Sequence, residues 1–142
     1  MTNQSPAEAI PEIVNLAEDR GNHSGGQATA RRTAWKFVLM KTERQIHLVV
    51  GPVSLFRYHS NLVDGFCRRY EIPASKARGG HRVEIYDRSV RVLGGGHVSV
   101  DSESKRLRFF SQSTAYGPFD ADTVSFILKR GSFFAGYLVL ID

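Results

Sequence analysis

Three consecutive glycines inside a strand-like pattern are the feature of this sequence that most restricts its fold. Gly94–Gly96 are followed by Val98 and Val100, which alternate with polar neighbours as in a β-strand. A polar turn at residues 101–104 leads to a second alternating run at residues 107–109, so the segment predicts a β-hairpin. Glycine weakens a strand by roughly 0.5–1 kcal/mol per position relative to alanine. Three glycines therefore indicate a bulge, or the close approach of another backbone or of a ligand.

The return strand of this hairpin ends in a hydroxyl-rich turn. Residues 113–118 read Ser-Thr-Ala-Tyr-Gly-Pro and lead into a helix that we expect to begin at Asp120 or Asp122 and to end by Gly131. A loop of this kind can direct backbone N–H groups at an anion. From the residues alone two interpretations stay open, an anion site and an ordinary bulged hairpin.

Composition limits the classes of protein to which the chain can belong. With 142 residues, of which 42% are hydrophobic, it fits one globular domain with its own core. The net charge of +5 indicates anionic partners, but the basic residues are scattered in pairs, which argues against nucleic acid. Cys67 is the only cysteine, which excludes an internal disulfide and a thiolate metal site. Without a signal core or a long apolar run, a cytoplasmic protein with no membrane partner is expected.

The chain divides into a polar first part and a strand-rich second part. Residues 1–33 are predicted to be a mobile tail with room for a short helix over Glu8–Glu18. Trp35–Met40 is predicted to be a central strand covered on both faces, with Gln45–Val50 as its hairpin partner. Lys36 interrupts this apolar run, and its simplest interpretation is a lysine at a frayed strand end with its head in water.

The remaining elements give the fold class. We expect a flexible basic loop over residues 74–81, a strand over Arg82–Tyr86 before the glycine hairpin, and a last strand over Phe133–Ile141. The order is β-β-α-β-β-β-α-β. It predicts a single α+β domain over residues 34–142, with a mixed or antiparallel sheet and two main helices packed on it.

The first of these helices places a histidine at its start. It is expected to begin near Tyr58 or His59 and to close before Pro73. His59 lies three and four residues before Leu62 and Val63, so its side chain shares their sheet-facing stripe. A histidine titrates near neutrality, and the unpaired N–H groups of a helix start attract anions. The alternative is a histidine at the core edge whose ring is satisfied by a backbone carbonyl.

Four motifs, in the same order, resemble those of one protein family. Leu93–Val98, Lys105–Leu107 and Ser113–Pro118 resemble the LGGGRI…S-x-A-Y-G-P signature of protein histidine phosphatases, the Janus/Ocnus family. Trp35–Leu39 resembles the first strand of that family, and Tyr58–His59 resembles its catalytic Tyr-His pair at a helix start. The match runs from about Trp35 to the end of the chain.

The resemblance implies hydrolysis of a phosphoramidate, namely the P–N bond of phosphohistidine, phospholysine or a related compound, without a metal or other cofactor. His59 would be the general base, and Lys36 would be the catalytic lysine that faces the phosphate. The other implied phosphate contacts are Tyr58, Ser60, Gly94, His97, Ser113 and Ala115. The implied partners are a phosphorylated protein or a small phosphoramidate, together with inorganic phosphate, and the chain is expected to act as a monomer.

The sequence also departs from the family pattern. His97 stands where the signature has arginine, Asn61 replaces an acidic residue, and no arginine occurs between Gly51 and Leu55. Histidine offers a single donor and is charged only part of the time, so it recognises phosphate less strongly than a guanidinium. A catalytically weak module that binds phosphate or phosphoproteins on the same fold is therefore the alternative function, and a basic nucleic-acid-binding domain is a more distant third.

Overall fold

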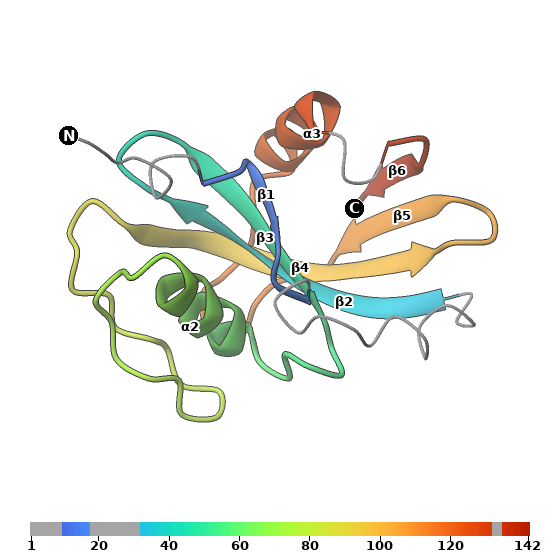
Figure 1. Cartoon of the computed structure of the whole chain (residues 1–142). Helices are drawn as coiled ribbons and strands as arrows, with labels where there is room; N and C mark the ends of the chain where they lie inside the picture. The colour runs from blue at the N-terminus through green and yellow to red at the C-terminus, as the bar shows by residue number, and fades with distance from the viewer. Residues whose placement is uncertain (1–9, 18–31, 132–134) are drawn as a thin grey trace.

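In the described part of the chain, six strands form one mixed sheet in the order β1-β3-β2-β4-β5-β6, with two helices packed on it (Figure 1). The structure is a computed structural model that describes residues 10–17, 32–131 and 135–142. In chain order the elements are β1 (Ile13–Asn15), β2 (Arg32–Lys41), β3 (Ile46–Pro52), α2 (His59–Arg69), β4 (Arg91–Asp101), β5 (Arg106–Phe110), α3 (Ala121–Arg130) and β6 (Leu138–Ile141). The two edge pairs, β1 with β3 and β5 with β6, are parallel, and the inner pairs are antiparallel. The predicted α+β class is confirmed.

Strand β2 lies at the centre of the sheet because its residues can be buried on both faces. Phe37–Met40 are almost completely inaccessible to solvent, between β3 on one side and β4 on the other. The predicted hairpin of β2 with β3 is also present, and its turn is closed by a hydrogen bond from the Thr42 N–H to the Gln45 carbonyl at 2.9 Å.

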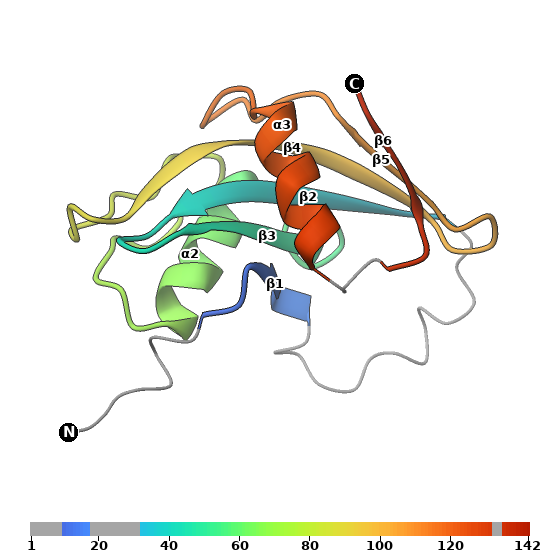
Figure 2. The ribbon, with the colours of Figure 1, turned by 90° about the horizontal axis from the view of Figure 1, so that it is seen from above.

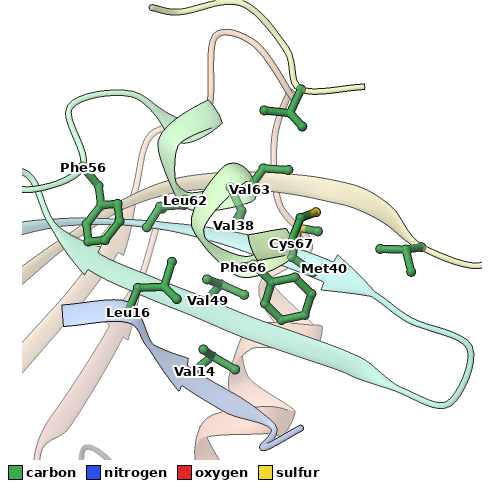
Figure 3. Close-up of a cluster of buried hydrophobic side chains, with 12 residues drawn as sticks. Val14, Leu16, Val38, Met40, Val49, Phe56, Leu62, Val63, Phe66 and Cys67 are labelled. Carbon is green, nitrogen blue, oxygen red and sulfur yellow. The ribbon is translucent and has the colours of Figure 1, made fainter. Parts of the chain in front are cut away.

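The two helices cover opposite faces of this sheet. Val38 and Met40 point toward α2, where they pack with Val14, Val49 and Phe66 in one apolar cluster (Figure 3). The alternate residues of β2 belong to a second cluster with α3. Figure 2 shows α3 in front of the central strands, with α2 behind them. A side chain at an even-numbered position of β2 therefore lies on the α2 face.

The predicted helix over Glu8–Glu18 is wrong where the structure describes it. Ile13–Asn15 form the edge strand β1, which runs parallel to β3 with Val14 opposite Val49. Val14 and Leu16 are each 1% exposed, so this short segment completes the core under α2. An open edge of β3 offers unpaired backbone groups, and pairing with it outweighs the weak helical pattern of these residues. The rest of the predicted tail lies outside the described residues.

The connection from α2 to β4 also differs from prediction. Arg82–Tyr86 do not form a strand of the sheet; Ile85 makes only an isolated bridge to Ala74. The connection is instead tied down by single hydrogen bonds, from the Ser60 hydroxyl to the Gly79 carbonyl at 2.7 Å and from the Val83 N–H to the Tyr116 hydroxyl at 2.7 Å. At the end of the chain, β6 is shorter than predicted and begins at Leu138.

The three glycines are explained by both reasons that the sequence allowed. Leu39 pairs with Gly94 but Met40 pairs with Val92, so the extra residue of a bulge in β4 is Leu93, directly before the glycines. Gly94 has a φ of +129°, and a Cβ there would overlap the Pro118 carbonyl. A Cβ at Gly96 would lie 2.7 Å from the Phe110 carbonyl oxygen. The glycines therefore let the 113–118 turn sit directly against the sheet.

Candidate functional site

A pocket of about 300 Å³ lies where β2, β4, the start of α2 and the 112–115 turn meet. Its walls come from segments far apart in the sequence, and the lining residues are Lys36, Tyr58, His59, Gly80, His97, Gln112, Thr114 and Ala115. Larger pockets of about 550 and 740 Å³ lie beside α2 and α3, but no histidine is among their described lining residues. We therefore take the smaller pocket as the candidate site because of its lysine and two histidines, although it is not the largest.

His59 is the first residue of α2 and is 7% exposed. Its Nε2–H donates to the Gly96 carbonyl at 2.8 Å, which fixes the proton on Nε2 and leaves Nδ1 with a lone pair. The pKa of this ring is lowered to about 4, mainly by burial and less by the nearby Lys36 and His97, against the opposing effect of the hydrogen bond to the Gly96 carbonyl. His59 is therefore neutral near physiological pH, with one nitrogen held and one available.

Lys36 reaches the same pocket from the α2 face of β2. It lies directly opposite His97 in the antiparallel register, and its Nζ donates to His97 Nε2 at 3.2 Å. Burial lowers the pKa of Lys36. Burial, and then the charge of Lys36, lower the pKa of His97. The two side chains thus form a pair in which the ammonium donates and the imidazole accepts.

Backbone N–H groups without acceptors occur in two of the segments that form the pocket wall. Within the described parts of the chain, the N–H groups of His59 and Ser60 at the start of α2 have no hydrogen-bond partner, and those of Thr114 and Ala115 have none either. The Tyr58 N–H is taken by the Asn61 side chain at 2.8 Å. Two sets of free donors, together with a lysine, are groups that can donate hydrogen bonds to a small anion with several acceptor oxygens.

The structure brings five of the predicted site residues together and leaves three outside the pocket wall. Lys36, Tyr58, His59, His97 and Ala115 line it. Ser60, Ser113 and Gly94 are placed next to it, each with another contact.

The contacts of these three neighbours show what each does. The Ser60 hydroxyl donates to the Gly79 carbonyl, and Gly94 packs against Pro118. Ser113 is 1% exposed; its N–H donates to the carbonyls of Gly95 and Gly117, and its Oγ accepts from the Tyr116 N–H at 3.0 Å. Ser113 therefore stabilises the turn whose other residues, Gln112, Thr114 and Ala115, line the pocket.

Sequence reasoning missed Gly80, Gln112 and Thr114 as lining residues. Thr114 belongs to the hydroxyl-rich turn that the sequence singled out, so that signal was present. Gly80 had no such signal, because it reaches the pocket only through the Ser60–Gly79 hydrogen bond, which brings the 74–86 connection over the start of α2.

Among the described residues, no three His, Cys, Asp or Glu side chains gather closely enough to hold a metal ion. No helix in the described part of the chain has the length and apolar character needed to cross a membrane.

Comparison with known families supports the resemblance. Residues 27–137, well over half of the chain, match the Janus/Ocnus family (Ocnus). A comparison with curated proteins gave no match. The matched range contains every lining residue of the pocket.

Proposed function

The chain belongs to the Janus/Ocnus family, which includes phosphohistidine phosphatases, and we propose that it hydrolyses the P–N bond of a phosphoramidate in the pocket around His59. The proposed substrates are phosphohistidine in a protein, phospholysine, or a small phosphoramidate. The observation on which the proposal rests is a buried, neutral histidine with a free nitrogen, beside a lysine and two sets of unpaired N–H groups.

In the proposed reaction, a water molecule attacks phosphorus opposite the leaving nitrogen. His59 Nδ1 takes a proton from that water as the O–P bond forms and the P–N bond breaks. The leaving nitrogen takes up a proton from solvent or from His59, which gives a free amine or imidazole and inorganic phosphate. The Gly96 carbonyl fixes the tautomer of His59 that this role requires.

The phosphoryl group itself would be held by fixed donors. The Lys36 ammonium and the free N–H groups of residues 59, 60, 114 and 115 are oriented before substrate arrives, so they need no reorganisation as negative charge develops on the phosphoryl oxygens. Removal of one such preorganised donor costs about 10²–10³ in kcat in well-studied sites.

Release of phosphate from chemically phosphorylated histidine tests this proposal. We expect turnover by the wild type above the spontaneous rate, and loss of most of it in Lys36→Met. Lys41→Met, on the same strand but on the opposite face, is the matched control and should keep wild-type turnover. Failure of the wild type to release phosphate would contradict a hydrolytic function.

A phosphate-binding module with little activity is the second candidate. It is favoured by His97, which stands where the family signature has arginine, and whose Nε2 is engaged by Lys36. Binding of inorganic phosphate without turnover of any phosphoramidate would select this function. Absence of both binding and turnover would exclude the two candidates together.

A further inference from the structure

His97 and Lys36 make a contact that the family signature cannot make. Their Cα positions pair directly across β2 and β4, and Nζ lies 3.2 Å from Nε2. An ammonium has only donors, so the imidazole must accept through a nitrogen without a proton. An arginine at this position has no acceptor and would present a second cation to Lys36 instead.

Other contacts hold the His97 ring in place. The centre of the His97 ring lies 5.6 Å from the centre of the His59 ring in a T-shaped arrangement, and 5.7 Å from the centre of the Phe110 ring on β5. A lysine side chain is long and flexible, and it loses conformational entropy when its head is fixed. A rigid acceptor that is already packed in place lowers the additional entropy lost when a ligand binds.

We propose that His97 is a positioning residue, which holds the Lys36 ammonium beside His59 as a neutral acceptor and does not itself bind the phosphoryl group as a cation. This inference rests on the proposed function only in assuming that the pocket binds phosphate. It assigns the position a different role from the one implied by the family signature.

The proposal also sets a direction for the effect of pH. The charged or titratable groups that face His97 are Lys36 from β2 and His59 from α2. The third neighbour, Phe110 from β5, is neutral, and the Arg108 guanidinium lies over its ring. Protonation of His97 removes the lone pair that Lys36 uses and places two positive charges side by side. Burial and Lys36 lower the pKa of His97, so the pair is intact near neutral pH and is lost as pH falls through that lowered value.

A double-mutant cycle on inorganic phosphate binding tests the assignment. Phosphate affinity is measured by calorimetry for the wild type, His97→Leu, Lys36→Met and the double variant. We expect His97→Leu to weaken binding by about threefold to tenfold, and to have no further effect once Lys36 is replaced. If the losses of phosphate affinity in the two single variants multiply in the double variant, His97 contacts phosphate independently of Lys36 and the proposal is overturned. Unchanged phosphate binding in His97→Leu would also overturn it.

Two more variants separate positioning from folding. His97→Gln replaces the nitrogen acceptor by an amide oxygen, so it should recover most of the phosphate affinity that His97→Leu loses. The amide does not titrate, so this affinity should not fall at low pH. Ser99→Leu, two residues along on the same face of β4, introduces the same leucine outside the pocket wall and should leave phosphate binding unchanged. If Gln binds no better than Leu, the acceptor role is wrong.

Because phosphate binding is read without turnover, failure of the proposed hydrolysis and failure of this inference are distinguishable. A protein that binds phosphate with the expected cycle but cleaves no phosphoramidate keeps the His97 assignment and loses the hydrolytic function. A wild type that binds no phosphate overturns the inference.

Discussion

Two buried histidines lie on the same face of the sheet, near opposite ends of α2, and only one of them has a free nitrogen. His47 is 1% exposed, and both of its ring nitrogens are occupied, with Nδ1 donating to the Pro11 carbonyl at 2.8 Å and Nε2 accepting from the Thr42 hydroxyl at 3.0 Å. His59 is held through Nε2 alone. Burial lowers the pKa of both rings.

The difference shows that burial and a lowered pKa do not by themselves mark a catalytic histidine. The contact of His47 with Pro11 ties the segment before β1 to β3, and its contact with Thr42 holds the β2–β3 turn, so no lone pair is left for chemistry. His59 combines one structural contact with an open nitrogen and with anion-binding groups beside it. The number of occupied nitrogens separates a structural histidine from a candidate base.

The same substitution at the two positions should give opposite results, and this is the largest effect that we expect. His59→Gln can still donate to Gly96 but cannot act as a base, so kcat/KM for a phosphoramidate should fall by about 10²–10⁴. His47→Gln should keep kcat/KM within about twofold and lower the free energy of unfolding by about 1–3 kcal/mol, because it disturbs a buried hydrogen-bonded pair. Steady-state kinetics and urea unfolding of both variants check this. Near-full turnover in His59→Gln would remove the catalytic assignment.

Acid should destabilise the protein through both histidines. Their pKa values in the folded state lie below the unfolded value of about 6.5, so below that pH the unfolded chain binds protons that the folded chain does not. Stability is therefore complete above about pH 6.5 and falls as pH drops toward the folded values, and the His59 share reaches about 2–3 kcal/mol near pH 4.5. Urea unfolding at about pH 7.5 and about pH 4.5 should show a smaller acid loss in each Gln variant than in the wild type. Equal losses in all three proteins would contradict the lowered values.

The activity itself should resist mild acid. With a pKa of about 4, His59 stays neutral down to about pH 5, whereas an unperturbed histidine would lose about tenfold of its basic form between pH 7.5 and pH 5.5. In His97→Gln, which removes the titration of residue 97, we expect kcat/KM, corrected for the ionisation of the substrate and for spontaneous hydrolysis, to change by less than about twofold over that range. At the alkaline end it should fall when Lys36 loses its proton, below the usual lysine pKa. An acidic midpoint near 6.5 would show that the base is not this buried ring.

Freeing a nitrogen of His47 should cost stability without creating activity. Thr42→Val removes the hydroxyl that donates to Nε2, so the free energy of unfolding should drop by about 1 kcal/mol. In the His59→Gln background the same change should give no turnover, since no lysine is among the described residues that line the pocket beside His47. Turnover gained by Thr42→Val would mean that a free buried nitrogen is enough.

Chelation should have no effect at either histidine. The described residues place no third His, Cys, Asp or Glu ligand with any pair at these positions, and the proposed chemistry uses only side-chain and backbone donors. Activity measured after dialysis against EDTA should equal that of untreated protein. Loss of activity that one divalent ion restores would contradict the proposed mechanism.

Local signals predicted most of the fold. The apolar run of β2, the Asp120 cap and Gly131 end of α3, and the glycine hairpin are each specified by neighbouring residues, and the structure confirms them. Strand β1 could not be predicted in this way. It is three residues long, and its formation depends on pairing with β3 more than 30 positions later, which no local pattern reveals.

For the site, too, local patterns predicted individual residues but not the contacts between distant segments. The position of His59 at a helix start followed from apolar spacing, and Ala115 lay in a turn that the sequence had singled out. The contact between Lys36 and His97 depends on the register of β2 against β4, which is shifted by the bulge, and the contribution of Gly80 depends on how the long connection folds back. Such contacts are properties of the assembled sheet.

The group that orients His59 is a main-chain carbonyl, and this affects how the site can change during evolution. If a side chain, such as a carboxylate, accepted the hydrogen bond from His59, a single substitution could remove it. The Gly96 carbonyl is part of the strand itself, and only a displacement of β4 can remove it. The side chains that line the pocket can therefore diversify, as position 97 has done, while the tautomer of the histidine is inherited with the sheet.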